Sequence, residues 1–151
     1  MNKYIIGMGN YAKNDDGIGL RIIEHIIDNN LDDGFKAIEA ANDGIKALTF
    51  FTEETEEILF VDCALIDKQP GEFLIFSPED VETKKITGTI STHEGDIIKL
   101  FQLAEETGCH IPKISILAIQ PESLGMGMTL SEALETRLGS YVHAAIAEIT
   151  R

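Results

Sequence analysis

Apolar runs and helical repeats alternate along this chain of 151 residues. Runs typical of buried strands occupy residues 3–8, 35–40, 57–62, 72–76 and 113–119. Between and after them, apolar residues recur at helical spacing in residues 18–27, 44–51, 93–106 and 130–149. Strands that alternate with helices are typical of an α/β fold. We therefore predict a three-layer α/β/α sandwich, one domain over residues 1–151, around a mostly parallel, mixed five-stranded sheet.

Short connections and capping motifs refine this prediction. The link Asp67-Lys68-Gln69-Pro70-Gly71 is too short for a right-handed crossover, so residues 72–76 should run antiparallel to residues 57–62. The sequences Ser91-Thr92-His93-Glu94 and Thr129-Leu130-Ser131-Glu132 match the capping box, which predicts that a helix begins at each.

Acidic residues greatly outnumber basic ones, 26 against 12, which gives a formal net charge of -14. This charge argues against binding to nucleic acids or to anionic membrane surfaces. The N-terminus lacks the pattern of a signal peptide, and no apolar stretch reaches the roughly 18 residues of a membrane span. Cys63 and Cys109 show neither metal-site nor disulfide spacing. We expect a cytoplasmic protein.

Three residues far apart in the sequence should meet at one edge of the sheet. Ligands of open α/β sheets bind beyond the carboxyl ends of the strands. Asp16 follows the first strand and Asp62 ends the third, so on parallel neighbours about 4.8 Å apart the two carboxylates can meet. Residues 77–92 are long enough to return His93 to this edge, where a helix N-terminus would keep its imidazole neutral. Two carboxylates and one imidazole suit a divalent metal ion.

Each of these residues also has a structural interpretation. Asp15 and Asp16 could cap the first helix, Asp62 could cap the next loop, and His93 could simply begin a helix. The glycines at 17 and 19 argue against a mere cap, because each costs a helix about 1 kcal/mol. Close approach of another backbone would explain them.

A dinucleotide site is the main alternative from the residues. Gly7-Met8-Gly9-Asn10-Tyr11-Ala12 matches the G-x-G-x-x-A pattern, and Glu39 ends the second strand, where an acid would bind a ribose. However, helix signals begin near Asp15, Asp15 and Asp16 would repel phosphate, and Glu39 comes later than the usual spacing. The alternative is a dinucleotide-binding oxidoreductase.

Several motifs together carry a family resemblance. Over nearly its whole length the chain resembles the hydrogenase maturation endopeptidases, through Gly7-Met8-Gly9-Asn10, Asp15-Asp16-Gly17-Ile18-Gly19, Val61-Asp62-Cys63, His93 and Gln120-Pro121-Glu122-Ser123-Leu124. The resemblance implies a cytoplasmic endopeptidase that removes a C-terminal extension from the precursor large subunit of a [NiFe] hydrogenase after nickel insertion. It further implies that Asp16, Asp62 and His93 are metal ligands.

The nickel would arrive with the precursor, and no organic cofactor is expected. Two other hypotheses stay open. Asp16 and Asp62 could act as a catalytic aspartic dyad, or the protein could be a nickel-sensing or metallochaperone module without peptidase activity. Members often carry Asp-Gly-Gly after the second strand, whereas this chain has Glu39-Ala40-Ala41-Asn42-Asp43-Gly44. Glu39 is the candidate to supply that acid, so we count it with Asp16, Asp62 and His93 as a candidate catalytic residue.

Overall fold

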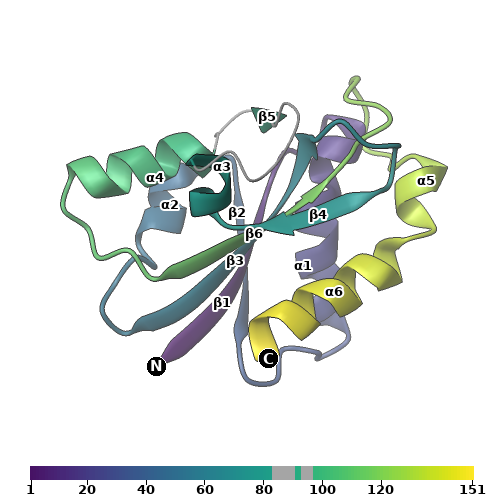
Figure 1. Cartoon of the computed structure of the whole chain (residues 1–151). Coiled ribbons are helices and arrows are strands. Elements are labelled where there is room, and N and C mark those ends of the chain that lie inside the picture. The colour runs from purple at the N-terminus through teal and green to yellow at the C-terminus, as the bar shows by residue number, and fades with distance from the viewer. Residues whose placement is uncertain (83–90, 93–96) are drawn as a thin grey trace.

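Parallel strands form the centre of the molecule in the computed structural model, which describes residues 1–82, 91–92 and 97–151. The sheet runs in the order β2-β1-β3-β6-β4, with β4 antiparallel to β6 and the other neighbours parallel (Figure 1). These strands are β1 (Asn2–Met8), β2 (Lys36–Ala41), β3 (Thr55–Leu65), β4 (Phe73–Phe76) and β6 (Lys113–Ile119). A two-residue strand, β5 (Ser91–Thr92), pairs with β3 off this path. The predicted α/β fold with a mixed sheet is confirmed.

Helices cover both faces of the sheet (Figure 1). The long helices α1 (Ile18–Asp28) and α6 (Leu138–Thr150) pack on one face, and α2 (Gly44–Leu48) and α4 (Ile97–Glu106) pack on the other. The short helices are the 3-10 helix η1 (Asn14–Gly17), α3 (Pro78–Glu82) and α5 (Glu132–Glu135). Among the described residues, no helix has the length and apolar character needed to cross a membrane.

Strand β3 shows how the sequence builds two cores. Ile58 and Phe60 point into the core beneath α2 and α4, whereas Leu59 and Val61 point into the core beneath α1 and α6. All four are fully buried, as expected for a central strand with helices on both faces. At roughly 2 kcal/mol for each buried side chain of this size, this strand is a major source of stability.

The neighbour of β4 differs from the simplest expectation. The strand runs antiparallel to β3 in direction, as predicted, but it pairs with β6, which lies between them. Strand β6 is buried along nearly its whole length, whereas β4 is short and only partly buried. The more apolar strand therefore takes the central position and the shorter one the edge.

The first predicted capping box lies partly outside the described residues. Ser91 and Thr92 lie in β5, paired with Leu65 and Ala64, whereas His93 and Glu94 are outside the described residues and α4 is described from Ile97. Strand β3 continues three residues past the predicted end at Asp62, and its backbone groups there need partners. Pairing with β5 provides partners at Ala64 and Leu65.

The second predicted capping box also differs from the structure. The N-cap of α5 is Ser131 rather than Thr129, and no side-chain cap bond forms there. The predicted C-terminal helix is divided, because α5 ends at Glu135 and α6 begins at Leu138. Its apolar stripe is largely confirmed, with buried positions at Leu134, Val142, Ala145 and Ile149.

Candidate functional site

Asp62 lies where β1 ends beside β3. Asp62 pairs with Ala118 of β6. The pairing of β1 with β3 stops one residue earlier, at Gly7 and Val61. The side chain is 1% exposed, and its Oδ1 accepts a 2.8 Å hydrogen bond from the backbone N–H of Cys63. Asp62 thus sits at the carboxyl edge of the parallel strands, as predicted.

Asp16 reaches the same place from the helix η1. It is also 1% exposed, and its backbone carbonyl accepts a hydrogen bond from Asn10. Gly9 lies between the two acids with φ +133°, and a Cβ atom there would collide with the Asp16 carbonyl and lie 3.9 Å from Asp62 Oδ1. Any other residue at position 9 would be strained and would push against the backbone of Asp16. Both Asp16 and Asp62 therefore lie next to Gly9, Asp16 through its backbone and Asp62 through its carboxylate.

Gly19, in the first turn of α1, allows the start of this helix to lie close to the ends of β1 and β3. A Cβ atom on this residue would collide with the backbone carbonyls of Met8 and Val61. A Cβ atom on Gly7 would in turn lie 2.6 Å from the Gly19 carbonyl. The glycine at 19 thus permits a close backbone approach, as the sequence indicated. This packing also accounts for the first glycine of the dinucleotide-like pattern without any nucleotide.

The pKa of Cys63 responds to the charged groups at this edge of the sheet. Its thiol is buried on the α1 and α6 side of the sheet, opposite in strand alternation to Asp62. Burial raises the pKa of the thiol far above its usual range, and the negative charges of Asp62, Asp16 and Asp15 raise it further. The thiol therefore stays protonated and packs as an apolar group.

Asp15 has a different role from its neighbour. Its carboxylate is fully buried and accepts hydrogen bonds from the backbone N–H groups of Glu122 (2.8 Å), Ser123 (2.9 Å) and Ser131 (2.7 Å), and from the Ser131 hydroxyl (2.8 Å). Neither η1 nor α1 has a side-chain cap bond at its N-cap. Instead of capping a helix, Asp15 fixes the segment that follows β6.

Replacing Asp15 by asparagine should destabilise the protein strongly. The amide NH₂ would face N–H donors that now meet a carboxylate, so at least one charge-assisted bond becomes a repulsion. We expect a loss of about 3 kcal/mol, which lowers the melting temperature by roughly 6–12 °C. Thermal unfolding measures this, with the exposed Asp33→Asn as control. A change no larger than that of the control would contradict the anchoring role.

His93 lies outside the described residues. The chain just before it is described, and Thr92 pairs with Ala64, two residues beyond Asp62 on β3. The chain is therefore back at the predicted edge of the sheet by Thr92, as expected from the length of residues 77–92. The role of His93 itself stays a prediction.

Glu39 belongs to a separate cluster. It is exposed on the edge strand β2, and its carboxylate accepts a 3.4 Å hydrogen bond from the Tyr11 hydroxyl, which also donates to Glu24 at 3.1 Å. Partial burial, the bond to Glu24 and repulsion by Glu39 raise the pKa of Tyr11 to about 12, so the phenol stays protonated at neutral pH. The contacts of Glu39 thus lie with Tyr11, and its catalytic role stays a prediction.

Ala41 is a feature that sequence reasoning missed. It adopts φ +51°, a left-handed conformation that costs a non-glycine residue about 1 kcal/mol. Its carbonyl accepts the N–H of Gly9, so the loop after β2 supports the turn next to Asp16 and Asp62. Asp43 then caps α2 by accepting from the Lys46 N–H. An alanine gives no sequence signal for such a turn.

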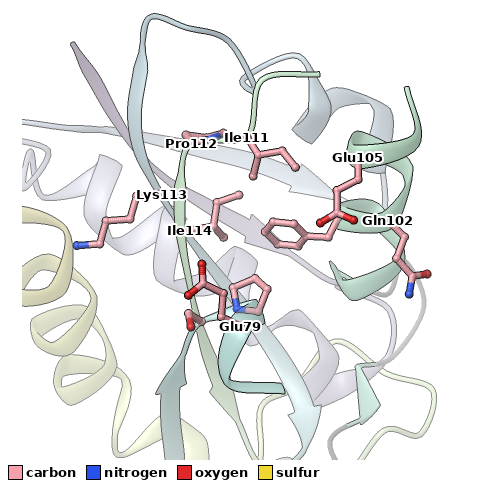
Figure 2. A pocket seen from close by; sticks show the side chains of 10 residues that line it. Glu79, Gln102, Glu105, Ile111, Pro112, Lys113 and Ile114 are labelled. Carbon is pink, nitrogen blue, oxygen red and sulfur yellow. The ribbon is translucent and has the colours of Figure 1, made fainter. Parts of the chain in front are cut away.

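A cavity of about 440 Å³ lies elsewhere, between α3, α4 and the start of β6. Figure 2 shows Ile111, Ile114, Gln102 and Glu105 around it, with the Lys113 amino group directed away. That amino group is 3.5 Å from Glu57. Neither Asp16 nor Asp62 lines this cavity, so it is not the predicted site.

The residues present suit a metal ion in part. Asp16 and Asp62 offer buried oxygen donors, which divalent ions accept. Within residues 1–82, 91–92 and 97–151, no group of three potential ligands is assembled. Among the predicted ligands, His93 lies outside these residues.

This architecture defines an α/β protein with a candidate site at the carboxyl edge of its parallel strands, where Asp16 and Asp62 are buried. Comparisons with known proteins assign the family. The family model of the hydrogenase maturation proteases matches residues 20–148. The hydrogenase 2 maturation protease of Escherichia coli is 23% identical over 99% of this chain and 91% of its own length.

Solved structures agree with this assignment. The [NiFe] hydrogenase maturation protease HybD from Thermococcus kodakarensis superimposes with a TM-score of 0.80 at 25% identity, over 99% of both chains. The hydrogenase maturating endopeptidase HybD from E. coli gives a TM-score of 0.78 at 22% identity, over 99% of this chain and 93% of that one. The chain belongs to the hydrogenase maturation proteases and is a peptidase. This favours the peptidase over the dinucleotide-binding oxidoreductase.

Proposed function

We propose that this protein removes the C-terminal extension of the precursor large subunit of a [NiFe] hydrogenase after nickel has been inserted. Asp16, Asp62 and His93 recognise the nickel, which is part of the substrate. The observation that carries the proposal is that Asp16 and Asp62 are both buried next to Gly9, at the carboxyl edge of β1 and β3. We further propose a cytoplasmic location, with which the free thiols of Cys63 and Cys109 are compatible.

The two buried acids offer oxygen donors to a cation. A positive charge close to a buried carboxyl group favours its ionised form. A nickel ion that reaches this edge with the precursor would supply that charge. Because the two carboxylates alone cannot complete a coordination shell, binding should be strong only when the precursor adds its own ligands. The site would thus distinguish nickel-loaded from empty precursor.

Hydrolysis can then follow the chemistry of an aspartic-type peptidase. Nickel held by Asp16 and Asp62 positions the extension so that its scissile carbonyl lies next to the carboxylates. One carboxylate accepts a proton from a water molecule, whose oxygen adds to the carbonyl carbon. The C–N bond breaks as the proton passes to the leaving nitrogen, which gives a new carboxyl terminus and a free amine.

The test compares nickel-loaded with nickel-free precursor. We expect intact-mass spectrometry to show the loss of one C-terminal peptide from the loaded precursor and no change in the empty one. Equal cleavage of both would contradict nickel recognition. Binding of the loaded precursor without any loss of mass would instead identify a nickel-sensing module, and saturable binding of NAD(P) in a fluorescence titration would favour the oxidoreductase.

A further inference from the structure

Residues 122–131, which we call the methionine loop, leave β6 at the same edge of the sheet as Asp62. The loop presents Met126 and Met128 to solvent, with exposed fractions of 85% and 65%. Such exposure of large apolar side chains gains nothing for folding. Two exposed methionines next to a candidate active site are therefore typical of a surface that binds another molecule.

The backbone of the methionine loop is held in place. Gly127 donates its N–H to the Ala12 carbonyl at 3.0 Å and accepts the Asn14 N–H at 2.8 Å. The carbonyl of Met128 accepts a 2.8 Å hydrogen bond from Arg21. Asp15, the neighbour of Asp16, fixes both ends of the loop through the bonds described above. The two methionines are thus exposed by a fixed backbone rather than by a loose segment.

A groove lies beside the loop, between α1 and the start of α6. It encloses about 340 Å³ and has Met128, Leu130 and Leu138 among its lining residues. The carboxylates of Glu24, Asp28 and Glu135 also line it. The guanidinium of Arg21 is engaged by the Met128 carbonyl and lies 5.3 Å from the ring centre of Tyr11. The lining of the groove therefore combines apolar side chains with three carboxylates, together with Arg21 and His25.

We propose that the methionine loop and this groove bind a segment of the precursor that carries apolar and basic side chains. This inference rests on the proposed function and names the surface that recognises the substrate. Methionine side chains are flexible and polarisable, and they adapt to the apolar side chains of a partner. The three carboxylates that line the groove complement lysine or arginine. A second copy of this chain fits poorly, because its formal net charge of -14 would be repelled.

Charge reversal in the groove tests the proposal. The double variant Asp28→Lys/Glu135→Lys should raise the KM for nickel-loaded precursor about tenfold without changing kcat, since it alters capture of the substrate and not the cleavage step. The matched control is Glu53→Lys/Glu54→Lys, which makes the same change of charge at exposed residues of the turn before β3, at the opposite edge of the sheet. The control should keep the KM of the natural protein.

The methionines are tested in the same way. Met126→Gln/Met128→Gln keeps the length of both side chains but removes their apolar character, and it should raise the KM about fivefold. Equal KM values for the groove variant, the methionine variant and the control would overturn the proposal. So would sedimentation showing that the natural chain dimerises through these methionines while the KM is unaffected by their loss.

Failure of this proposal can be separated from failure of the proposed function. If the natural protein cleaves the precursor and the groove variants cleave it equally well, only the groove proposal falls. If the natural protein cleaves nothing, the affinity for nickel-free precursor is measured directly by fluorescence anisotropy. A loss of affinity in the groove variant but not in the control would then support the surface without the peptidase mechanism.

Discussion

Replacing Asp62 by asparagine will reduce processing of nickel-loaded precursor by at least about a hundredfold, while the protein keeps its fold. Asparagine has nearly the same shape, and its amide oxygen can still accept the N–H of Cys63, which Asp62 Oδ1 accepts now. What is lost is the negative charge that binds a cation or takes a proton from water. Intact-mass spectrometry of the precursor measures the processing, and thermal unfolding measures the stability.

A second buried carboxylate on the same strand provides the control. Glu57 is 6% exposed at the opposite end of β3, where it pairs with Lys113. Glu57→Gln weakens an ion pair but leaves the carboxyl edge of the sheet unchanged, so processing should remain normal. If Asp62→Asn instead lowered the melting temperature and left processing intact, Asp62 would be a structural residue and the site would be misassigned.

Much of the fold could be predicted because its signals are local. The apolar runs that became β1, β3 and β6 are buried on both faces, and the helical repeat of α1 has one apolar side. The convergence of Asp16 and Asp62 also followed, because parallel neighbouring strands deliver their carboxyl ends to one edge. The glycine at 19 indicated close packing, since it has no other reason to stand in a helix.

Contacts between distant segments account for what the sequence did not reveal. Ser131 looked like part of a capping box, but its hydroxyl binds Asp15, 116 residues away. The pairing of Ser91 with Leu65 was not predicted either, because β3 extends three residues beyond Asp62. Local preference favours a cap such as Ser131 by only about 1 kcal/mol. A buried carboxylate that needs donors outweighs that preference.

The separation of Glu39 from the acid pair has a similar cause. The end of a strand fixes the edge at which a side chain lies, but its face depends on the alternation along that strand. Ala40 packs into the core beneath α2 and α4, so Glu39 next to it points to the other side, toward Tyr11 and Glu24. The sequence therefore predicted the edge for Glu39 but could not decide its face.

Treating the isolated enzyme with a chelator should leave processing of nickel-loaded precursor nearly unchanged. Within the described residues, no group of three potential metal ligands is assembled, and burial raises the pKa of the Cys63 thiol so that it is not a thiolate. Two carboxylates, even with one imidazole, bind a divalent ion weakly compared with sites that include thiolates, so the purified enzyme should be largely free of metal. A chelator, removed again before the precursor is added, would then have little to take away.

Removing nickel from the precursor should have the opposite effect and stop processing, because the complete coordination shell forms only in the complex. The measurement is the mass of the large subunit after incubation in each of the four combinations of treated or untreated enzyme with loaded or empty precursor. We expect cleavage to follow the precursor's nickel and not the enzyme's treatment. If chelator-treated enzyme lost its activity and regained it only with added zinc, the protein would be a metallopeptidase with its own catalytic ion, because a resident zinc would then be supplying the activated water.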